Sequence, residues 1–257
     1  MNSRILSRLF LGFAVLCVAV SAFAQGLCTE GTTSGGPLGD KVRNTKTYIM
    51  PKMYRHEGGD GNVVIIRLDK EMLYLVTPEA KTYSVMTFAE MEEKAKTAGA
   101  QMDARTQEMQ EKLKDMSDEE RQMMEKMMGR MMGGKEKKVD VEGPGEKKTI
   151  NGYSCAKYTA TSDGNVVLTV WTSKDVKGFE SMKHDWEKFS SRLMSMNPLK
   201  GKILAEAFKK IDGFPMQTEV GGMTMLVTKI EKRTTPASQF EVPSSYTQTD
   251  SPLKNME

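Results

Sequence analysis

Methionine is the residue type whose spacing is most open to chemical interpretation, because the 257-residue chain contains 22 of them. Four methionines recur every seven residues and lead into a dense cluster: Met102, Met109, Met116, Met123, Met124, Met127, Met128, Met131 and Met132. Residues three and four apart are neighbours on a helix. One helix face would therefore carry four of them: Met124, Met127, Met128 and Met131.

Three interpretations of this cluster stay open. The methionines can form the apolar face of a helix that packs on a sheet, because methionine fills irregular core space well. They can form a soft surface that binds an acyl chain or a protein partner. They can also bind Cu(I), for which thioethers are suitable ligands, with Met123, Met124, Met127 and Met128 as candidates. No histidine lies near the cluster, and charged residues are frequent around it.

Two cysteines lie beyond the first 24 residues, Cys28 and Cys155. In an oxidising compartment such a pair suggests a disulfide. Closing so long a loop would stabilise the fold by about 4–5 kcal/mol in the chain-entropy model. The alternative is two independent cysteines, with Cys155 buried in an alternating strand and Cys28 in a loose N-terminal segment.

The residue types that usually carry catalysis are sparse in this chain. His56 and His184 are the only histidines, and neither has a partner at metal-ligand spacing, so we expect both on the surface. The sequence contains no Gly-x-Ser-x-Gly, His-Glu-x-x-His, Cys-x-x-Cys or P-loop motif. A cysteine nucleophile needs a histidine base. We therefore expect a protein that is not an enzyme and that needs no cofactor.

The first 24 residues have the three parts of a cleavable signal peptide. Arg4 and Arg8 precede an apolar run over 9–20, and Ala22-Phe23-Ala24 is a small-x-small cleavage site. The run is shorter than the about 20 residues that span a bilayer. We expect cleavage after Ala24, a mature chain without a transmembrane segment, and a periplasmic or secreted location.

Removal of this segment changes the charge balance. It holds two of the 37 lysines and arginines and none of the 34 acidic residues. The mature chain would then be close to neutral. Nothing in this balance indicates a nucleic-acid partner.

The pattern of residues along the chain alternates between stretches typical of β-strands and stretches typical of α-helices, and these elements must position the residues discussed above. Short β-branched runs with tight turns cover 47–86 and 153–171, and Ser162-Asp163-Gly164 predicts a hairpin in the second of them. A last hairpin covers 215–231 around Gly221-Gly222. The capping-box pair Thr87 and Glu90 predicts a helix over 88–115, and Ser117 starts a second one that ends at Gly133-Gly134. The charged, Gly- and Pro-containing stretch 135–148 is expected to be a linker, and further helices are expected at 179–194 and 199–211.

Strands in hairpins favour an antiparallel sheet. We expect an α+β fold, with one curved sheet partly covered by helices and a Met-rich helical hairpin inserted over 88–134. The alternatives are one long kinked helix in place of the hairpin, and two small domains divided at the linker in place of a single sheet. The expected organisation is a signal peptide (1–24), a loose segment (25–40), a single domain (41–246) and a flexible tail (247–257).

Several short motifs resemble one exported bacterial family, the domain of unknown function 4412. They are Val63–Asp69, Pro78–Tyr83, Asn151–Tyr158, Val170-Trp171, Gly213–Pro215 and Pro236–Pro243. That family is similar to the lipoprotein carriers LolA and LolB. The resemblance extends over about residues 41–246 and implies a half-open antiparallel β-barrel with helices across its concave face.

The resemblance also implies that the chain holds a lipid or another apolar ligand in this concave face. Trp171 and Trp186 could line such a cavity, together with the methionine face at 124, 127, 128 and 131. The alternatives are a Met-rich Cu(I)-binding envelope protein and a structural protein that docks an envelope partner.

Overall fold

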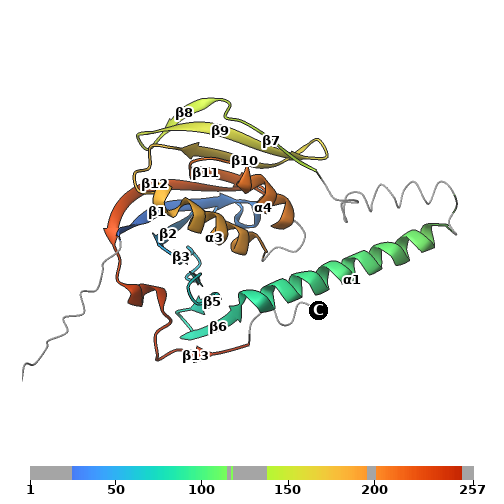
Figure 1. Cartoon of the computed structure of the whole chain (residues 1–257), viewed down its shortest axis with the longest axis horizontal. Helices are drawn as coiled ribbons and strands as arrows, with labels where there is room; N and C mark the ends of the chain where they lie inside the picture. The colour runs from blue at the N-terminus through green and yellow to red at the C-terminus, as the bar shows by residue number, and fades with distance from the viewer. Residues whose placement is uncertain (1–24, 115–116, 118–137, 196–200, 251–257) are drawn as a thin grey trace, which may run out of the picture.

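The computed structural model of the chain describes residues 25–114, 117, 138–195 and 201–250. The fold is α+β, with one large, curved, open sheet that is mostly antiparallel and few helices (Figure 1). The order of the strands is β13-β6-β5-β4-β3-β2-β1-β12-β11-β10-β9-β7, and β8 also pairs with β9. Among the strands of the described ranges, all pairs are antiparallel except β13 with β6.

The first half of the sheet is a meander. Its strands are β1 (Gln25–Gly35), β2 (Arg43–Met50), β3 (Met53–Glu57), β4 (Val63–Arg67), β5 (Met72–Thr77) and β6 (Thr82–Thr87). The second half contains β7 (Val139–Glu142), β8 (Lys147–Ile150), β9 (Tyr153–Ser162), β10 (Asn165–Ser173), β11 (Phe214–Val220), β12 (Met223–Thr234) and β13 (Thr247–Gln248). The helical elements are η1 (Gly36–Leu38), α1 (Phe88–Lys114), η2 (Glu180–Met182), α3 (Lys183–Ser195), α4 (Gly201–Lys209) and η3 (Ala237–Phe240).

Two predicted hairpins are confirmed, and the backbone explains why. Asp163 and Gly164 between β9 and β10 have φ of 51° and 72°, and Gly221 and Gly222 between β11 and β12 have φ of 58° and 79°. Positive φ at both central residues is what a type I′ turn requires, and its twist matches that of the paired strands.

The segment 25–40 is not the loose lead-in that its Gly, Ser and Thr content suggested. Residues Gln25–Gly35 form β1, which lies inside the sheet and pairs with both β12 and β2. Threonine favours strands, and two partners satisfy the backbone on both edges of this strand. The register shifts at Gly31, where a Cβ atom would lie 2.6 Å from the carbonyl oxygen of Leu226.

Two other segments expected to be irregular also pair with the sheet. The charged stretch after residue 135, expected to be a linker, contributes β7 and β8. Within the expected flexible tail, Thr247 and Gln248 form β13 beside β6. In both cases a neighbouring strand supplies backbone hydrogen-bond partners that composition alone does not reveal.

The helix α1 confirms the predicted start at the capping box. The Glu90 backbone N–H donates to Thr87 Oγ1 at 3.1 Å, and the Thr87 N–H donates to Glu90 Oε2 at 2.7 Å. The first turn of α1 packs on the domain, where Phe88 and Met91 are buried. The rest of the helix projects away from the sheet (Figure 1).

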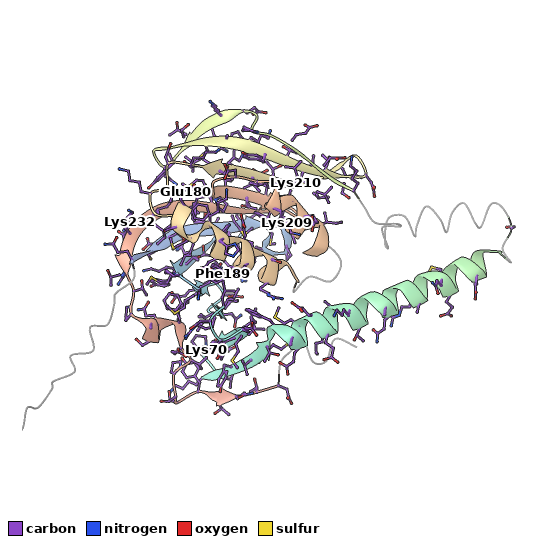
Figure 2. All side chains as sticks on the ribbon, viewed as in Figure 1. Lys70, Glu180, Phe189, Lys209, Lys210 and Lys232 are labelled. Carbon is purple, nitrogen blue, oxygen red and sulfur yellow. The ribbon has the colours of Figure 1, made fainter. Side chains whose placement is uncertain are left out.

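In the residues that the structure describes, the buried side chains form three clusters. The largest lies between the sheet and α3 and includes Ile66, Leu73 and the fully buried Phe189, which Figure 2 labels near the middle of the domain. A second lies under the C-terminal segment that carries Phe240. Ile65 belongs to the second cluster although its neighbour Ile66 belongs to the first, because successive strand residues point to opposite faces.

The third cluster lies under α4. It contains Val139, Ala160, Leu168, Val170, Leu204 and Ala207. This packing holds α4 against β7, β9 and β10. The neighbouring helix α3 contacts α4, and the two helices lie side by side over one end of the sheet (Figure 1).

Candidate functional site

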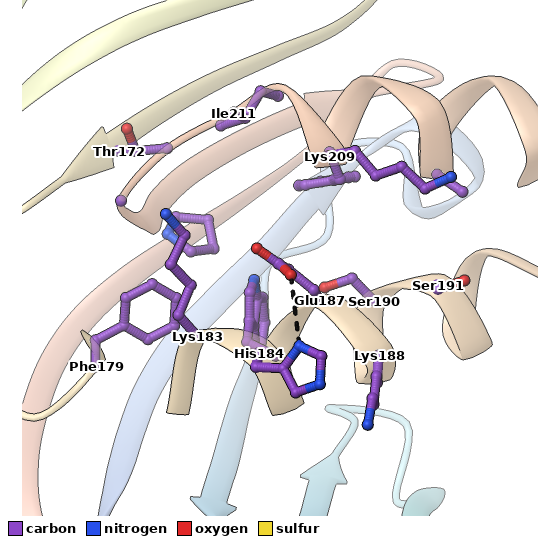
Figure 3. A pocket seen from close by; sticks show the side chains of 15 residues that line it. Thr172, Phe179, Lys183, His184, Glu187, Lys188, Ser190, Ser191, Lys209 and Ile211 are labelled. Atoms are coloured by element: carbon purple, nitrogen blue, oxygen red, sulfur yellow. Dashed lines mark ion pairs between the residues drawn. The ribbon is translucent and has the colours of Figure 1, made fainter. Parts of the chain in front are cut away.

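A pocket of about 350 Å³ lies between α3, α4 and the adjoining ends of β10 and β11 (Figure 3). Its apolar lining comes from Phe179, Trp186, Ala205, Phe208, Ile211 and Pro215. Its polar lining comes from Thr172, Lys183, His184, Glu187, Lys188, Ser190, Ser191 and Lys209. The pocket therefore combines an apolar interior with a charged rim.

The sequence of α3 explains how one helix serves both the core and the pocket. Phe189 and Ser190 are buried on its inner side, whereas His184 and Glu187 are exposed. The helix is fixed at its N-terminal end by Asp185, whose Oδ2 accepts a hydrogen bond from the Lys52 N–H at 2.8 Å. That bond joins α3 to the turn between β2 and β3.

Two of the rings that line the pocket, Phe179 and Trp186, belong to an aromatic group that also includes the buried Phe214, and they form the aromatic floor of the pocket. The ring centroid of Trp186 lies 6.2 Å from that of Phe179 and 6.1 Å from that of Phe214. Phe179 meets Phe214 edge to face at 5.1 Å. Aromatic pairs at these separations add to the stabilisation that burial provides. Trp186 is only partly buried, so this cluster extends from the core to the pocket surface.

Two lysines share one carboxylate at the rim. Lys183 Nζ lies 2.5 Å from Asp212 Oδ1, and Lys174 Nζ lies 2.6 Å from Asp212 Oδ2. The hydrogen bonds from Lys174 and Lys183 lower the pKa of Asp212 to about 2, so this side chain is ionised at neutral pH. The group of three residues carries one net positive charge.

The other charges of the rim lie on the two helices. Figure 3 shows Glu187 between α3 and α4, with its carboxylate 4.0 Å from His184 Nδ1. On α4, Lys209 Nζ lies 2.6 Å from Glu206, and both side chains are about half exposed or more. Ion pairs this exposed contribute roughly 0–1 kcal/mol and exchange easily with a ligand.

The structure separates the two tryptophans that the sequence proposed for one cavity. Trp186 lines the pocket, whereas Trp171 is not part of the lining. Trp171 is buried, and Lys148 Nζ lies 4.0 Å from the centre of its ring. Sequence reasoning missed Lys183 and Asp212 as site residues, because they are 29 positions apart and only the fold joins them.

The proposed methionine sites cannot be placed. Met123, Met124, Met127, Met128 and Met131 lie outside the described residues, as does the cleavage residue Ala24. Within the described ranges, no group of three or more His, Cys, Asp or Glu side chains could hold a metal ion.

The two cysteines are not joined in this structure. Both are buried free thiols. Cys28 belongs to the cluster under Phe240, and Cys155 belongs to the cluster at α3. Burial raises the pKa of both thiols. The expectation that Cys155 is buried in a strand is thus met, while Cys28 lies in a strand rather than in a loose segment.

Only one histidine fits the expectation of a surface position. The His184 side chain is 77% exposed. His56 is half-buried, and its Nδ1 lies 2.9 Å from Thr47 Oγ1. Burial lowers the pKa of His56, because a charged imidazolium loses hydration there.

These features define the chain as an α+β protein with a mostly antiparallel curved sheet and a pocket between two covering helices. The chain belongs to the family described as Domain of unknown function (DUF4412), whose model matches residues 105–246. The motifs before residue 105 lie outside this match. No curated protein matches the sequence.

The chain has a low structural similarity to PNGF-II, in its solved structures in space groups C2 and P21. They align with TM-scores of 0.37 and 0.38 at 9% identity. The alignments cover 88% and 89% of this chain but 31% and 32% of the PNGF-II chains. This chain thus spans about a third of the length of those chains, and a similarity at this level transfers neither fold nor function.

In the described part of the chain, no helix has the length and apolar character to cross a membrane.

Proposed function

We propose that this protein is an exported, non-enzymatic binding protein that holds an apolar ligand in the pocket between α3 and α4. The observation that carries the proposal is the aromatic floor of the pocket under a charged rim. Small-molecule sites are typically concave, mostly apolar and equipped with a few polar groups that orient the ligand.

The ion pairs of Asp212 support a role of this carboxylate in binding rather than in proton transfer. Proton transfer near neutral pH needs a group whose pKa lies close to that range, whereas the pKa of Asp212 is lowered to about 2. The Lys183 ammonium at the rim is held by this ionised carboxylate. These groups are suited to fixing a ligand.

A relationship to the LolA and LolB carriers is part of the proposal. It is supported by the curved, mostly antiparallel sheet with α3 and α4 packed against it. The side chains of the largest cluster, such as Phe189 and Met216, fill the space between the sheet and α3. The proposed ligand therefore lies beside α3 rather than directly on the sheet.

The protein offers a direct reporter for this pocket. It contains two tryptophans, and Trp186 is the one that lines the pocket. In a Trp171→Phe background, the fluorescence of Trp186 should change when decanol or Nile red binds. Native mass spectrometry and organic extraction of the exported protein would identify the ligand that it carries from the cell.

A matched pair of variants locates the binding. Ala205 lines the pocket, so Ala205→Phe should fill it and weaken binding of both probes by at least about tenfold, the factor that corresponds to 1.4 kcal/mol. Ala104→Phe places the same ring on the exposed surface of α1 and should leave binding unchanged. Equal binding by the two variants, or no binding by the parent protein, would refute the proposed function.

A further inference from the structure

Three polar side chains on β2 and β3 form a hydrogen-bonded chain next to the aromatic rings of the core. Thr47 lies on β2 opposite His56 on β3, and its Oγ1 lies 2.9 Å from His56 Nδ1. The Tyr54 hydroxyl is hydrogen-bonded to the same threonine side chain. Tyr54 and His56 are two residues apart on one strand, so their side chains lie on the same face of the sheet. The chain therefore runs from Tyr54 through Thr47 to His56.

The Tyr54 end of this chain reaches the wall of the pocket. Tyr54 is buried, and its ring centroid lies 6.2 Å from that of Trp186 and 5.4 Å from that of Phe189. Trp186 lines the pocket, and Phe189 packs α3 against the sheet. His56 is half-buried at the other end, beside the turn between β3 and β4. One threonine thus connects an ionisable group to a ring that supports the pocket.

The chain sets the direction of its own hydrogen bonds. Burial raises the pKa of the Tyr54 phenol, so the phenol keeps its proton and donates to Thr47. The Thr47 hydroxyl then donates to Nδ1 of a neutral His56 that carries its proton on Nε2. Protonation of Nδ1 adds a third hydrogen to a chain that has only two links. One hydroxyl hydrogen then loses its acceptor, and such a loss is costly where the group is buried.

The charges around His56 do not compensate for this loss. Asp60 and Glu57 favour the imidazolium, but burial opposes it more strongly and lowers the pKa of His56. On β4, the residue opposite His56 is Val64, which carries no charge. Both carboxylates are themselves ion-paired, at 3.8 Å and 2.8 Å, with Arg43 and Arg55 respectively.

From this arrangement we infer that His56 is an acid-sensitive switch: when it binds a proton, its chain to Tyr54 loses a hydrogen bond and the support of Trp186 in the pocket weakens. Histidine is the side chain that ordinarily changes its charge between about pH 5 and pH 8. A histidine that is harder to protonate in the folded than in the unfolded chain lowers stability as the pH falls through this range. The inference goes beyond the proposed function, and only its ligand test rests on that function.

A proton NMR titration tests the chain in the free protein. The sequence has two histidines, so His56→Gln identifies the resonance of His56. Thr47→Val removes the hydroxyl but keeps a β-branched side chain, and the pKa of His56 should rise toward its ordinary value. Thr47→Ser keeps the hydroxyl and should retain the lowered pKa. The same pKa of His56 in these two variants would refute the chain.

Fluorescence tests whether the switch reaches the pocket. In a Trp171→Phe, His184→Gln background, Trp186 is the one tryptophan and the histidine of the pocket rim is removed. The emission of Trp186 should change between about pH 8 and about pH 5, with the same midpoint as the NMR titration of His56. His56→Gln should abolish the change. A change that persists in His56→Gln, or no change in the background protein, would refute control by His56.

Decanol binding in the same background connects the switch to the ligand. Decanol does not ionise in this pH range, so its own charge stays constant. Its binding should weaken by about two- to tenfold as His56 becomes protonated, the factor that corresponds to the loss of one hydrogen bond. It should not depend on pH in His56→Gln.

The outcomes separate this inference from the proposed function. Constant decanol affinity across the titration of His56 would refute its control of the pocket, while the apolar pocket itself would stand. If decanol binds at no pH, the proposed function fails. The NMR and fluorescence titrations need no ligand, so they would still decide whether His56 acts on Trp186.

Discussion

Lys183 and Asp212 connect the helix that forms one wall of the pocket to the turn that precedes β11. The Lys183 ammonium lies 2.5 Å from Asp212 Oδ1, and the Gly213 N–H donates to the same oxygen at 3.0 Å. The side chain of Thr172 donates to the Asp212 carbonyl oxygen at 2.6 Å. The carboxylate is thus part of the framework of the pocket as well as part of its electrostatics.

The pH dependence of stability should reveal this carboxylate. Its pKa in the folded protein, about 2, lies below the roughly 3.9 of an unfolded aspartate. A lowered folded-state pKa stabilises the fold above the unfolded pKa, and the contribution disappears as the pH falls from about 4 to about 2. Because the side chain is 40% exposed, Asp212→Asn should lower the free energy of unfolding by no more than about 1 kcal/mol at pH 7.

Urea unfolding at pH 7 and at pH 2.5 would measure this difference. Asp40→Asn, at an exposed position in the loop before β2, is the control and should change neither value. If Asp212→Asn lowered the free energy of unfolding by the same amount at both pH values, the lowered pKa of Asp212 would not be the source of that stability.

Arg67 should be the most important charged residue for the C-terminal segment. Its side chain is 7% exposed, and it pairs with Asp69 at 2.6 Å and with Glu241, while Nη1 also approaches the Phe240 carbonyl oxygen at 3.5 Å. Losing charge-assisted hydrogen bonds at a buried site costs about 1.5–3 kcal/mol. Arg67→Gln should lower the free energy of unfolding by about this amount.

The matched control is Arg43→Gln. Arg43 lies 3.8 Å from Asp60, and both side chains are more than a third exposed, so its loss should cost less than about 1 kcal/mol. Denaturant unfolding of both variants would measure the two changes in the free energy of unfolding. Similar costs for the two substitutions would mean that the contacts of Arg67 do not hold the C-terminal segment.

Phe189 should link the stability of the domain to the integrity of the pocket. It is fully buried, and its ring centroid lies 5.4 Å from that of Tyr54. Phe189→Ala should cost about 3–5 kcal/mol. His184→Ala, on the exposed side of the same helix, should stay within about 0.5 kcal/mol of the parent. Thermal unfolding of both variants, followed by circular dichroism, would measure these losses of stability. Equal stability of the two variants would mean that the burial of Phe189 does not hold α3 on the sheet.

The thiols of Cys28 and Cys155 should react slowly in the folded protein. Both are buried, and burial raises their pKa, so little of the reactive thiolate is present at neutral pH. Titration with a thiol reagent, followed by peptide mapping, should label both only after denaturation. If neither thiol is labelled in denaturant without a reductant, the two are bonded and the free state is wrong.

Export of the protein, as proposed above, predicts that the mature chain begins at Gln25. Cleavage after Ala24 would leave β1 intact, since Gln25 is its first residue and pairs with Thr234. Intact mass measurement of the protein from the periplasm or the medium would check this expectation. A protein that keeps its first 24 residues in the cytoplasm would contradict the exported location.

Local sequence signals determined several elements of this protein directly. The Thr87 and Glu90 capping box fixed the start of α1, and the Asp163-Gly164 turn fixed the hairpin of β9 and β10. Both depend on residues adjacent or three apart in the chain. The tight turns between successive strands likewise indicated an antiparallel sheet, because a hairpin joins two antiparallel strands.

Only the tertiary structure decided where β1 and the pocket lie. The Gly- and Thr-rich segment 25–35 becomes a strand because β2 and β12 satisfy its backbone on both sides, which no local signal encodes. The pocket needs Trp186 and Lys183 beside Phe214 and Asp212, residues that are far apart in sequence. Residues so far apart in the sequence are buried together or paired by charge only when the chain has folded. The sequence therefore indicated which residue types could form a site, and the tertiary structure determined which of them lie together.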